Sequence, residues 1–346
     1  MVETEYLIVG QGLAGTWLHH FLKQAGKHCL VIDQFNPLSA SHISSGIVNP
    51  ITGRKLVKTW LFDTMHDFAK PAYQQLENML DIKVWHDRNI VWLLQSEQDL
   101  NNFNARSATE GYAHHIAAVE RGNWRKGFQS AVGYAEVRGN FIDTALLINT
   151  YRKYLQQTEQ LREDFVKTDD LKLLSDGVQW KDVHAQKIIF CEGYLAAQNP
   201  YFTHLPHAPN KGEVLIIEAP ELQLTGHLVK GGAFLVPLSN GLYWAGSQYN
   251  FDEIDENATA NGRLEIETAL QRMLTVPYTV VNHWAGIRPS TMQRRPLVGL
   301  HRQFPQIGIL NGLGTKGVLM SAYFAHLLSE LLVYNQPLPK EIALNC

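Results

Sequence analysis

Gly10-Gln11-Gly12-Leu13-Ala14-Gly15 is the stretch of the sequence that decides the fold. The apolar run Glu5–Val9 precedes it and has the length and composition of a buried parallel strand. Leu13–Ala25 follows with apolar residues at helical spacing, and Gly26 stands where a helix C-terminus favours glycine. A second strand-like run, Cys29–Ile32, completes a β-α-β unit.

Each glycine of this loop has a physical reason. Gly10 permits a tight turn, Gly12 lets the backbone approach a pyrophosphate, and Gly15 allows the helix to pack closely on the strand. The helix N-terminus favours a negative charge. Asp33 follows the second strand at the distance where a carboxylate accepts hydrogen bonds from a ribose. An ordinary glycine-rich turn would explain the hexapeptide alone, but together with Asp33 it predicts a dinucleotide site.

The next segment, Ser39–Gly46, reads SASHISSG and is rich in small and hydroxyl side chains. Small side chains let backbone amides approach a ligand, and hydroxyl groups add hydrogen bonds without bulk. A solvent loop has the same composition, so the segment alone leaves both interpretations open. The glycine loop likewise does not decide between NAD and FAD.

Composition narrows the class of protein. The chain has 346 residues, of which 45% are hydrophobic and 18% are charged, so it can bury a sizeable core. At about 100–200 residues for each domain, this length predicts two domains or one large discontinuous domain. A net charge of −3 argues against a strongly basic nucleic-acid surface. Cys29, Cys191 and Cys346 lie too far apart in the sequence for a disulfide framework or a zinc ribbon.

Targeting and membrane segments are not expected. The first apolar run belongs to the β-α-β unit rather than to a signal peptide. The most apolar stretch, Val318–Tyr334, carries Ser321, His326 and Glu330, whereas a membrane-spanning helix needs about 20 nearly uninterrupted apolar residues. We therefore expect a buried helix there, no membrane span, and a soluble cytoplasmic protein.

Periodicity along the rest of the chain indicates two interleaved domains. Helices are expected at Phe62–Leu80, where Pro71 suggests a kink or a boundary, at Asp143–Leu155 and at Arg263–Leu274. Antiparallel strands are expected in the middle of the chain, at Glu213–Ile217, Phe234–Pro237 and Leu242–Ala245. Signals of a parallel sheet lie nearer the two ends.

Two motifs late in the chain are more specific. Gly286-Ile287-Arg288-Pro289-Ser290-Thr291 continues to Pro296 and Gly299, and Gly312-Leu313-Gly314-Thr315-Lys316-Gly317 precedes the last helix. Both resemble motifs of the D-amino acid oxidase-like FAD-dependent oxidoreductases, which include glycine and sarcosine oxidases. Gln293 departs from that pattern, which has Asp there, and Asp33 stands where the family more often has Glu. Lys187–Tyr194 and Asn210–Glu213 resemble further family segments.

The resemblance implies an α/β fold (α+β overall). A Rossmann-type FAD-binding domain with a parallel sheet would comprise residues 1–82, 139–205 and 280–346. A substrate domain with a mainly antiparallel sheet would comprise residues 83–138 and 206–279. FAD is expected to bind non-covalently, because the position of His42 does not match the histidine-linked pattern. The residues implied to bind FAD are Gly10, Gly12, Leu13, Ala14, Gly15, Asp33, Gln34, Ser41, His42, Ser45, Gly46, Gly193, Gly286, Arg288, Gly312, Leu313, Gly314, Thr315, Lys316 and Gly317.

Arg288 and Lys316 are the candidate catalytic residues. A guanidinium is a planar fork of donors that matches a carboxylate, and the resemblance places Arg288 at the substrate carboxylate. A structural ion pair or a surface arginine is the alternative. Lys316 is either a positive charge at the flavin edge or an exposed loop lysine. The aromatic residues Tyr243, Trp244, Tyr249 and Trp284 either line the substrate face or belong to the core.

The expected reaction is oxidation of the C–N bond of an amino acid or secondary amine. A hydride passes to flavin N5, the imine hydrolyses, and oxygen or a quinone accepts the electrons, so no acid–base triad is needed. Three alternatives remain: a flavin enzyme that modifies the wobble uridine of tRNA, a nicotinamide-dependent dehydrogenase, and a non-catalytic dinucleotide binder. No metal is expected, since His204-x-x-His207 lacks nearby acids and adjacent histidines such as His114 and His115 face different directions in a regular element.

Overall fold

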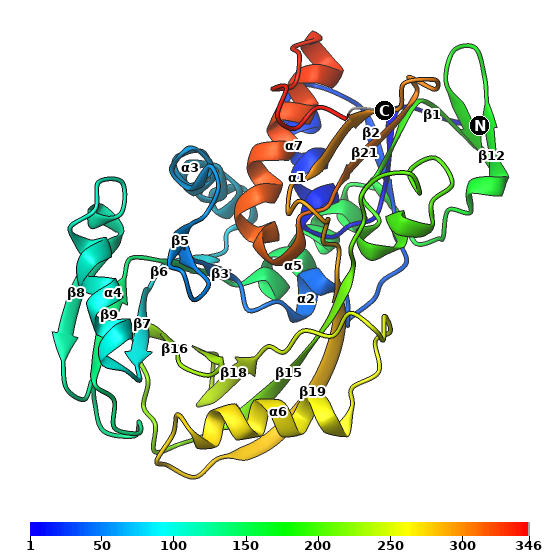
Figure 1. The fold of residues 1–346 in the computed structure, drawn as a ribbon. Helices are drawn as coiled ribbons and strands as arrows, with labels where there is room; N and C mark the ends of the chain where they lie inside the picture. Colours follow the sequence, from blue (N-terminus) through cyan, green and yellow to red (C-terminus); the bar gives the residue numbers. More distant parts are fainter. Residues whose placement is uncertain (345–346) are drawn as a thin grey trace.

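Two large sheets organise the chain, and the computed structural model describes residues 1–344 of it (Figure 1). The first, which we call the parallel sheet, is built on the predicted β-α-β unit of β1, α1 and β2. In it β1 lies between β2 and β14 and runs parallel to both, and β21 continues the sheet parallel to β14. The strands and helix named here are β1 (Val2–Val9), α1 (Leu13–Gln24), β2 (Cys29–Ile32), β14 (Val183–Phe190) and β21 (Ile307–Asn311).

Shorter strands complete this sheet. β11 pairs in parallel with β2, while β13, β12 and β20 add antiparallel pairs at the other side. Their bounds are β11 (Leu161–Arg162), β12 (Leu171–Leu173), β13 (Val178–Trp180) and β20 (Leu297–Leu300). The carboxyl ends of β1, β14 and β21 lie side by side, which brings three distant segments of the chain to one edge.

Helices pack together on the parallel sheet. α7 (Gly317–Tyr334) contacts both α1 and α3 (Phe62–Leu80), and α5 (Thr144–Gln157) contacts α1. Trp17, Tyr73 and Phe324 are fully buried in this core, where the Tyr73 hydroxyl donates to Val318 O at 2.7 Å. By length and composition α7 would suit a membrane span, but its buried residues pack in this core. The structure gives it the role of a core helix, as the sequence predicts.

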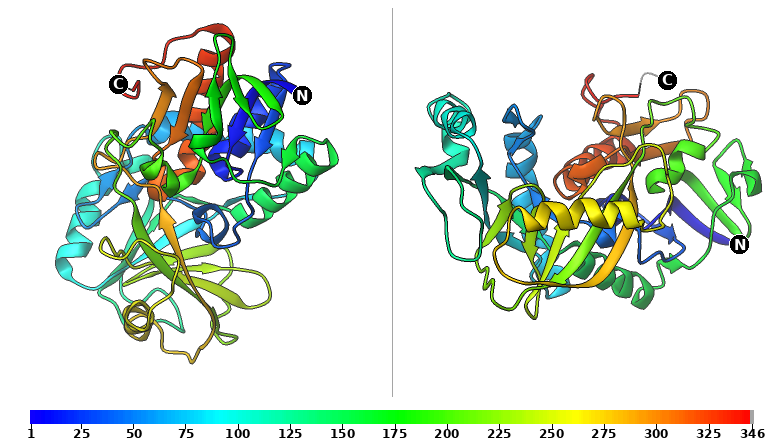
Figure 2. Two further views of the ribbon diagram at one scale, coloured as in Figure 1. Left: turned by 90° about the vertical axis from the view of Figure 1, so that its right-hand side faces the viewer. Right: turned by 60° about the horizontal axis from the view of Figure 1, so that its bottom comes forward.

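The second sheet, which we call the substrate-side sheet after the substrate domain expected from the sequence, has the order β19-β15-β18-β17-β16-β7-β9-β8 and is antiparallel except between β16 and β7. α6 (Ala260–Gln271) covers one face, as the right-hand view of Figure 2 shows. The strands are β7 (Asn89–Leu94), β8 (Ile116–Arg121), β9 (Gly133–Val137), β15 (Asn210–Glu218), β16 (His227–Lys230), β17 (Phe234–Pro237), β18 (Leu242–Gly246) and β19 (Thr279–Arg288). The mixed α/β architecture of the prediction is confirmed.

The other face of the substrate-side sheet is turned toward α2 (Ala40–Ile43). The indole Nε1 of Trp244 donates to Ile43 O at 2.9 Å, and a Cβ at Gly286 would lie only 2.4 Å from the Ile43 side chain. β19 pairs with β15 along its whole length, so the boundary expected at residue 280 falls at the start of an edge strand of this sheet.

Small elements connect the two sheets. They are β3 (Ile47–Val48), β10 (Asn140–Ile142) and β6 (Trp85–Asp87), which form a three-stranded sheet, and the hairpin of β4 (Ile51–Thr52) and β5 (Val57–Lys58). α4 (Glu97–Ser107) packs instead on β7, β8 and β9 of the substrate-side sheet. The helices predicted from periodicity are confirmed within a few residues. Pro71 lies inside α3, so it does not end that helix.

Candidate functional site

The glycine loop after β1 has the tight geometry predicted from its sequence. Gly10 has a φ of +99°, and a Cβ on it would lie 2.4 Å from Cys191 O. A Cβ on Gly15 would lie 1.9 Å from Gly10 O, so α1 can approach the strand only with glycine there. Gly12 precedes α1 and offers no side chain to cap it, which leaves N–H groups of the first turn for an anionic ligand.

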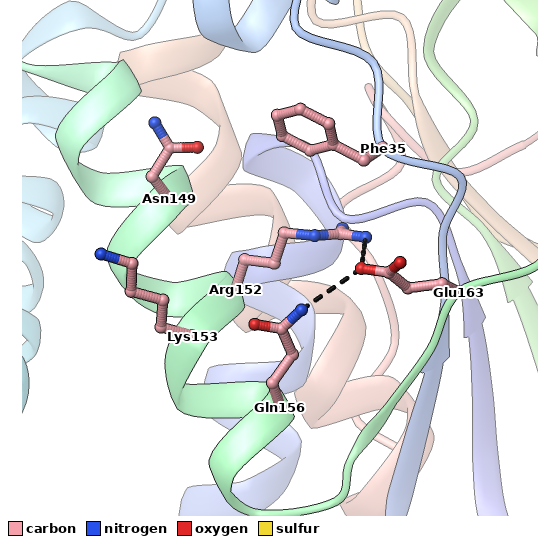
Figure 3. A pocket seen from close by; sticks show the side chains of 6 residues that line it. All are labelled: Phe35, Asn149, Arg152, Lys153, Gln156 and Glu163. Atoms are coloured by element: carbon pink, nitrogen blue, oxygen red, sulfur yellow. Dashed lines mark hydrogen bonds and ion pairs between the residues drawn. The ribbon is translucent and has the colours of Figure 1, made fainter.

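Asp33 is held beside this loop. One carboxylate oxygen accepts from Gln11 N at 2.8 Å, and the other accepts from Arg152 Nη1 at 2.6 Å. Arg152 comes from α5 and is buried, and it also donates to Glu163 at 2.8 Å. Figure 3 shows its guanidinium lying between Phe35 and Glu163 at the edge of a hollow. The sequence pattern did not identify Arg152, because its partner lies far away in the chain.

The serine-rich segment lies against the first turn of α1. Ser41 Oγ accepts from Leu13 N at 3.1 Å, which joins two residues of the predicted cofactor set. Gly46 has a φ of +65°, and a Cβ there would lie 1.9 Å from Ile142 O of β10. His42 contacts Ser39 Oγ at 2.8 Å and Asn149 Oδ1 at 3.2 Å, so both of its ring nitrogens have side-chain partners. Ser45 is half-buried in this segment, while Gln34 is exposed beyond β2.

A third segment reaches the same edge at the end of β14. Gly193 O accepts from Asn311 Nδ2 at 2.9 Å, which ties the end of β14 to the end of β21. Glu192, which the sequence analysis did not single out, accepts from Asn199 Nδ2 at 2.9 Å. Burial raises the pKa of Glu192 to about 7. This carboxyl group follows Cys191, whose carbonyl contacts the position of Gly10.

Residues Gly312–Gly317, which we call the late glycine loop, lie against the turn that follows Arg288. Gly312 and Gly314 have φ values of +73° and +54°, and a Cβ on Gly312 would lie 2.8 Å from Thr291. Gly314 N donates to Pro289 O at 3.1 Å. No side chain caps the N-terminus of α7, which begins at Gly317. The structure therefore brings together the two late motifs that the sequence singled out.

Arg288 ends β19 on the face that is turned toward α2. Its guanidinium donates to four oxygens, namely Asn210 Oδ1 at 2.8 Å, Lys211 O at 3.2 Å, Ser247 Oγ at 2.6 Å and Gln248 O at 3.2 Å. The Tyr249 ring lies 4.4 Å from it. Burial lowers the pKa of Arg288, yet within residues 1–344 it forms no ion pair with an acid. The alternative of a structural ion pair is therefore wrong.

Gly212 makes room for this guanidinium. It pairs with Gly286 in the register of β15 and β19, and a Cβ on it would lie 1.8 Å from Arg288 Nη2. Any larger residue would displace the guanidinium from its four acceptors. Position 212 thus serves Arg288, although the sequence shows only a strand glycine.

Lys316 lies in the late glycine loop and is half-buried. Its ammonium donates to Thr59 Oγ1 at 3.0 Å. Burial, together with Arg294 and Arg295, lowers the pKa of Lys316 to about 8. The alternative of an exposed loop lysine is wrong.

Comparison with known proteins shows the family to which this chain belongs. Residues 5–331 match the family model described as "FAD dependent oxidoreductase". The chain belongs to this family. Its relatives include a glycine oxidase of Pseudomonas aeruginosa, 24% identical over 96% of this chain and 95% of that protein. A crystal structure of an iminodiacetate oxidase from Chelativorans sp. BNC1 is 21% identical, with a TM-score of 0.84 and 98% of both chains covered.

A partial match concerns tRNA modification. A tRNA 5-methylaminomethyl-2-thiouridine biosynthesis bifunctional protein of Polaromonas naphthalenivorans is 28% identical over 39% of this chain and 22% of that protein. The match thus covers a minor part of both chains, whereas the family model covers most of this one.

This FAD-dependent oxidoreductase has a cradle that fits its cofactor. The carboxyl ends of three parallel strands meet there with the N-terminus of α1 and with glycines at positions where a Cβ would clash. Gly10–Gly15 suits the pyrophosphate, Asp33 with Arg152 lies where the ribose is expected, and Gly312–Gly317 suits the flavin end. The individual contacts of these residues with FAD stay predictions.

The aromatic candidates of this oxidoreductase separate onto different faces. Trp244 and Trp284 lie on the face that is turned toward α2 and pack in one cluster with Val214. Tyr243 lies on the opposite face in the cluster under α6, where its hydroxyl accepts from Leu224 N at 3.2 Å. The structure thus makes Tyr243 a core residue, while Tyr249 lies on Arg288 with 57% of its surface exposed.

The histidines considered for a metal have protein partners. His207 Nε2 lies 3.0 Å from Phe202 O. His114 and His115, expected to face different directions, both approach Asp63, with Nε2–Oδ1 distances of 3.5 and 3.0 Å, because they lie in a 3₁₀ turn. The Lys58 ammonium pairs with the same carboxylate and would repel a cation. We therefore interpret this group as an ion-paired cluster.

Proposed function

We propose that this oxidoreductase oxidises the C–N bond of a small amine that carries a carboxylate. The observation that carries this proposal is Arg288, a half-buried guanidinium that has no acidic partner among residues 1–344. It ends a strand of the substrate-side sheet and lies next to the turn that contacts the late glycine loop. A half-buried cation without an acidic partner favours an anionic ligand such as a carboxylate.

The proposed reaction is a two-electron oxidation. The chemistry that FAD supplies when bound is acceptance of a hydride from the substrate carbon next to nitrogen. The nitrogen loses its proton, the C–N bond becomes C=N, and water hydrolyses the imine to an amine and an oxo acid. Oxygen or a quinone takes up the two electrons afterwards. Non-covalent FAD, with His42 paired to Ser39 and Asn149, and a cytoplasmic location are parts of the same proposal.

The residues of the chain orient the substrate and stabilise charge. Arg288 attracts the carboxylate by its charge, and the four protein acceptors of its Nη donors fix the position of this cation. The N-terminus of α7, whose N-cap residue makes no side-chain hydrogen bond to it, favours negative charge at the flavin end, and Lys316 adds a positive charge there. Trp244 and Trp284 exclude water from the face on which Arg288 lies.

Anaerobic mixing with amines tests this proposal. Glycine, N-methylglycine, proline and other amino acids are added to the FAD-bound enzyme, and bleaching of the flavin absorbance is followed. We expect at least one carboxylate-bearing amine to bleach the flavin and the variant Arg288→Ala to require a much higher concentration. Bleaching only by tRNA that carries a modified wobble uridine would replace this proposal with tRNA modification. No bleaching by any of these amines or by that tRNA would refute both.

A further inference from the structure

Two cationic side chains contact Thr59 and Trp60, and a third cation lies near one of them. The Lys316 ammonium donates to Thr59 Oγ1 at 3.0 Å, and the Arg295 guanidinium lies 4.0 Å from the centre of the Trp60 ring. Arg294 is close enough to lower the pKa of Lys316. The three cations come from two segments, the turn after Arg288 and the late glycine loop.

None of these cations has an acidic partner in the part of the chain that the structure describes. The ion pairs of residues 1–344 include neither Lys316 nor Arg294 nor Arg295. The acid nearest in sequence to Thr59, Asp63, is already paired with Lys58. Like charges that repel one another and are partly withdrawn from water raise the free energy of the unbound protein. An anion placed among them would relieve this cost.

A chain of contacts connects the three cations to Arg288. Asn210 accepts from Arg288 through Oδ1 and donates to Ser290 Oγ through Nδ2 at 2.8 Å. The neighbouring carbonyl of Pro289 accepts from Gly314 N, two residues before Lys316. The turn after Arg288 and the late glycine loop are therefore in contact. Arg288 precedes the first of these turns and Lys316 lies in the second, and these two cations are the strongest candidates for binding an anion.

Lys316 has donor capacity to spare. An ammonium has three N–H donors, of which Thr59 takes one. The hydroxyl of Thr59 itself donates to Asn49 O at 3.0 Å, so its orientation is fixed. The Arg295 guanidinium lies over the Trp60 ring, and this contact holds it near Lys316 without using an N–H donor on an acidic side chain. The group is thus held in place by contacts that leave donors unused.

We propose that Lys316 and Arg295, supported by Arg294, form a second anion site for the substrate, so that the preferred amines carry a second carboxylate besides the one held by Arg288. This inference rests on the proposed function, because it concerns the substrate of the same site. The second carboxylate takes part in binding and orientation only. The bond that is oxidised remains the C–N bond described above.

A matched pair of compounds tests this inference. Iminodiacetate has two carboxylates, and its monoamide, N-(carbamoylmethyl)glycine, replaces one of them by a neutral group of the same shape. Binding to the FAD-bound enzyme is measured by the change in flavin absorbance, and reduction is measured anaerobically. We expect iminodiacetate to bind at least about tenfold more tightly than the monoamide, as for a charge held by partly buried cations.

Variants show whether the three cations cause this preference. Lys316→Met and Arg295→Gln are first shown to retain FAD by their absorbance spectra, and each is expected to reduce the ratio of the two affinities toward one. Arg272→Gln is the matched control, because Arg272 is exposed at the end of α6 and remote in the fold from these turns. The control is expected to keep the wild-type ratio. Two variants are used so that the loss of one through misfolding leaves the test intact.

The outcomes separate this inference from the proposed function. Equal affinities of iminodiacetate and its monoamide in the wild-type enzyme, or a ratio that neither variant changes, would overturn the second anion site. The proposed function would stand in that case if glycine or N-methylglycine still bleached the flavin. A phosphonate in place of the second carboxylate, as in N-(phosphonomethyl)glycine, is expected to restore tight binding in the wild-type enzyme and not in Arg295→Gln.

Discussion

Gly212→Ala is the substitution that should disturb Arg288, the proposed substrate anchor, while leaving the fold intact. Gly212 lies in β15 with ordinary strand neighbours, and its Cβ would meet the guanidinium of Arg288 rather than the backbone. Alanine is compatible with strand geometry at this position, since the φ of Gly212 is not in the left-handed region. We therefore expect the variant to fold and bind FAD but to lose its hold on the substrate carboxylate.

The distances set the size of the effect. The new Cβ would lie 1.8 Å from Nη2, 2.2 Å from Cζ and 2.5 Å from Nη1 of Arg288. Non-bonded heavy atoms need about 3.5–4.0 Å, so the guanidinium must withdraw by roughly 1.5–2 Å. Its contacts with Asn210 and Ser247, at 2.8 and 2.6 Å, cannot survive such a shift. A misplacement of about 1 Å can lower a rate about 100-fold.

Complete loss of the charge pair gives the upper limit. Removing one partner of a buried pair costs about 2–5 kcal/mol, which corresponds to roughly 30- to 5,000-fold. We expect Gly212→Ala to lower the ratio of reduction rate to dissociation constant about 100-fold or more for any carboxylate-bearing amine that bleaches the flavin. Anaerobic stopped-flow absorbance measures this ratio directly.

A double-mutant cycle identifies the route of the effect. If Gly212→Ala acts through Arg288, it should have little further effect in an enzyme that already carries Arg288→Ala. Equal losses in the presence and absence of Arg288 would refute the reasoning, and so would an unchanged ratio in the single variant. Flavin absorbance and thermal unfolding of each variant serve as controls for folding.

Further predictions concern the cofactor loop, the helix core and the pH dependence. Gly15→Ala should yield protein without bound FAD, seen as a lost flavin absorbance, because its Cβ would lie 1.9 Å from Gly10 O. Glu77→Leu should lower the free energy of unfolding by about 1–3 kcal/mol in denaturant titrations, because the N–H groups of Val84 and Trp85, which donate to Glu77 Oε1 at 2.7 and 2.6 Å, lose their acceptor. The preference for iminodiacetate over its monoamide should fall as the pH rises above about 8, because Lys316 loses its charge there; the Lys316→Met variant should show no such decline.

The parts of the fold that the sequence predicts are those that depend on near neighbours. The first β-α-β unit follows from apolar periodicity and glycines within about 30 residues, and the structure reproduces it. The turn at Arg288 and the late glycine loop were identified as motifs, and the structure joins them through Gly314 N and Pro289 O. Motif recognition succeeded here because each motif is itself a closely packed piece of backbone.

The residues that the sequence did not reveal act through partners far away in the chain. Arg152 supports Asp33 from α5, and nothing in the periodicity of that helix distinguishes it from a surface arginine. Gly212 matters only because Arg288 crosses over it from the neighbouring strand. Adjacent histidines were expected to diverge, but His114 and His115 converge on Asp63 because they lie in a 3₁₀ turn rather than in a regular helix or strand. Each case depends on tertiary contacts that no local pattern encodes.

The hydrogen bonds between the two late motifs explain how the chain can hold the cofactor loop and Arg288 in a fixed relative position. Asn210 belongs to the substrate-side sheet and bonds both Arg288 and Ser290, while the next carbonyl, that of Pro289, accepts from Gly314 of the late glycine loop. A shift of the substrate-side sheet relative to the loop would break these hydrogen bonds. Arg288, the proposed anchor for the carboxylate, is thereby held in a fixed position relative to the loop, because the same short turn bonds to both. Hydride transfer requires such constancy, since it depends steeply on the separation of the reacting atoms.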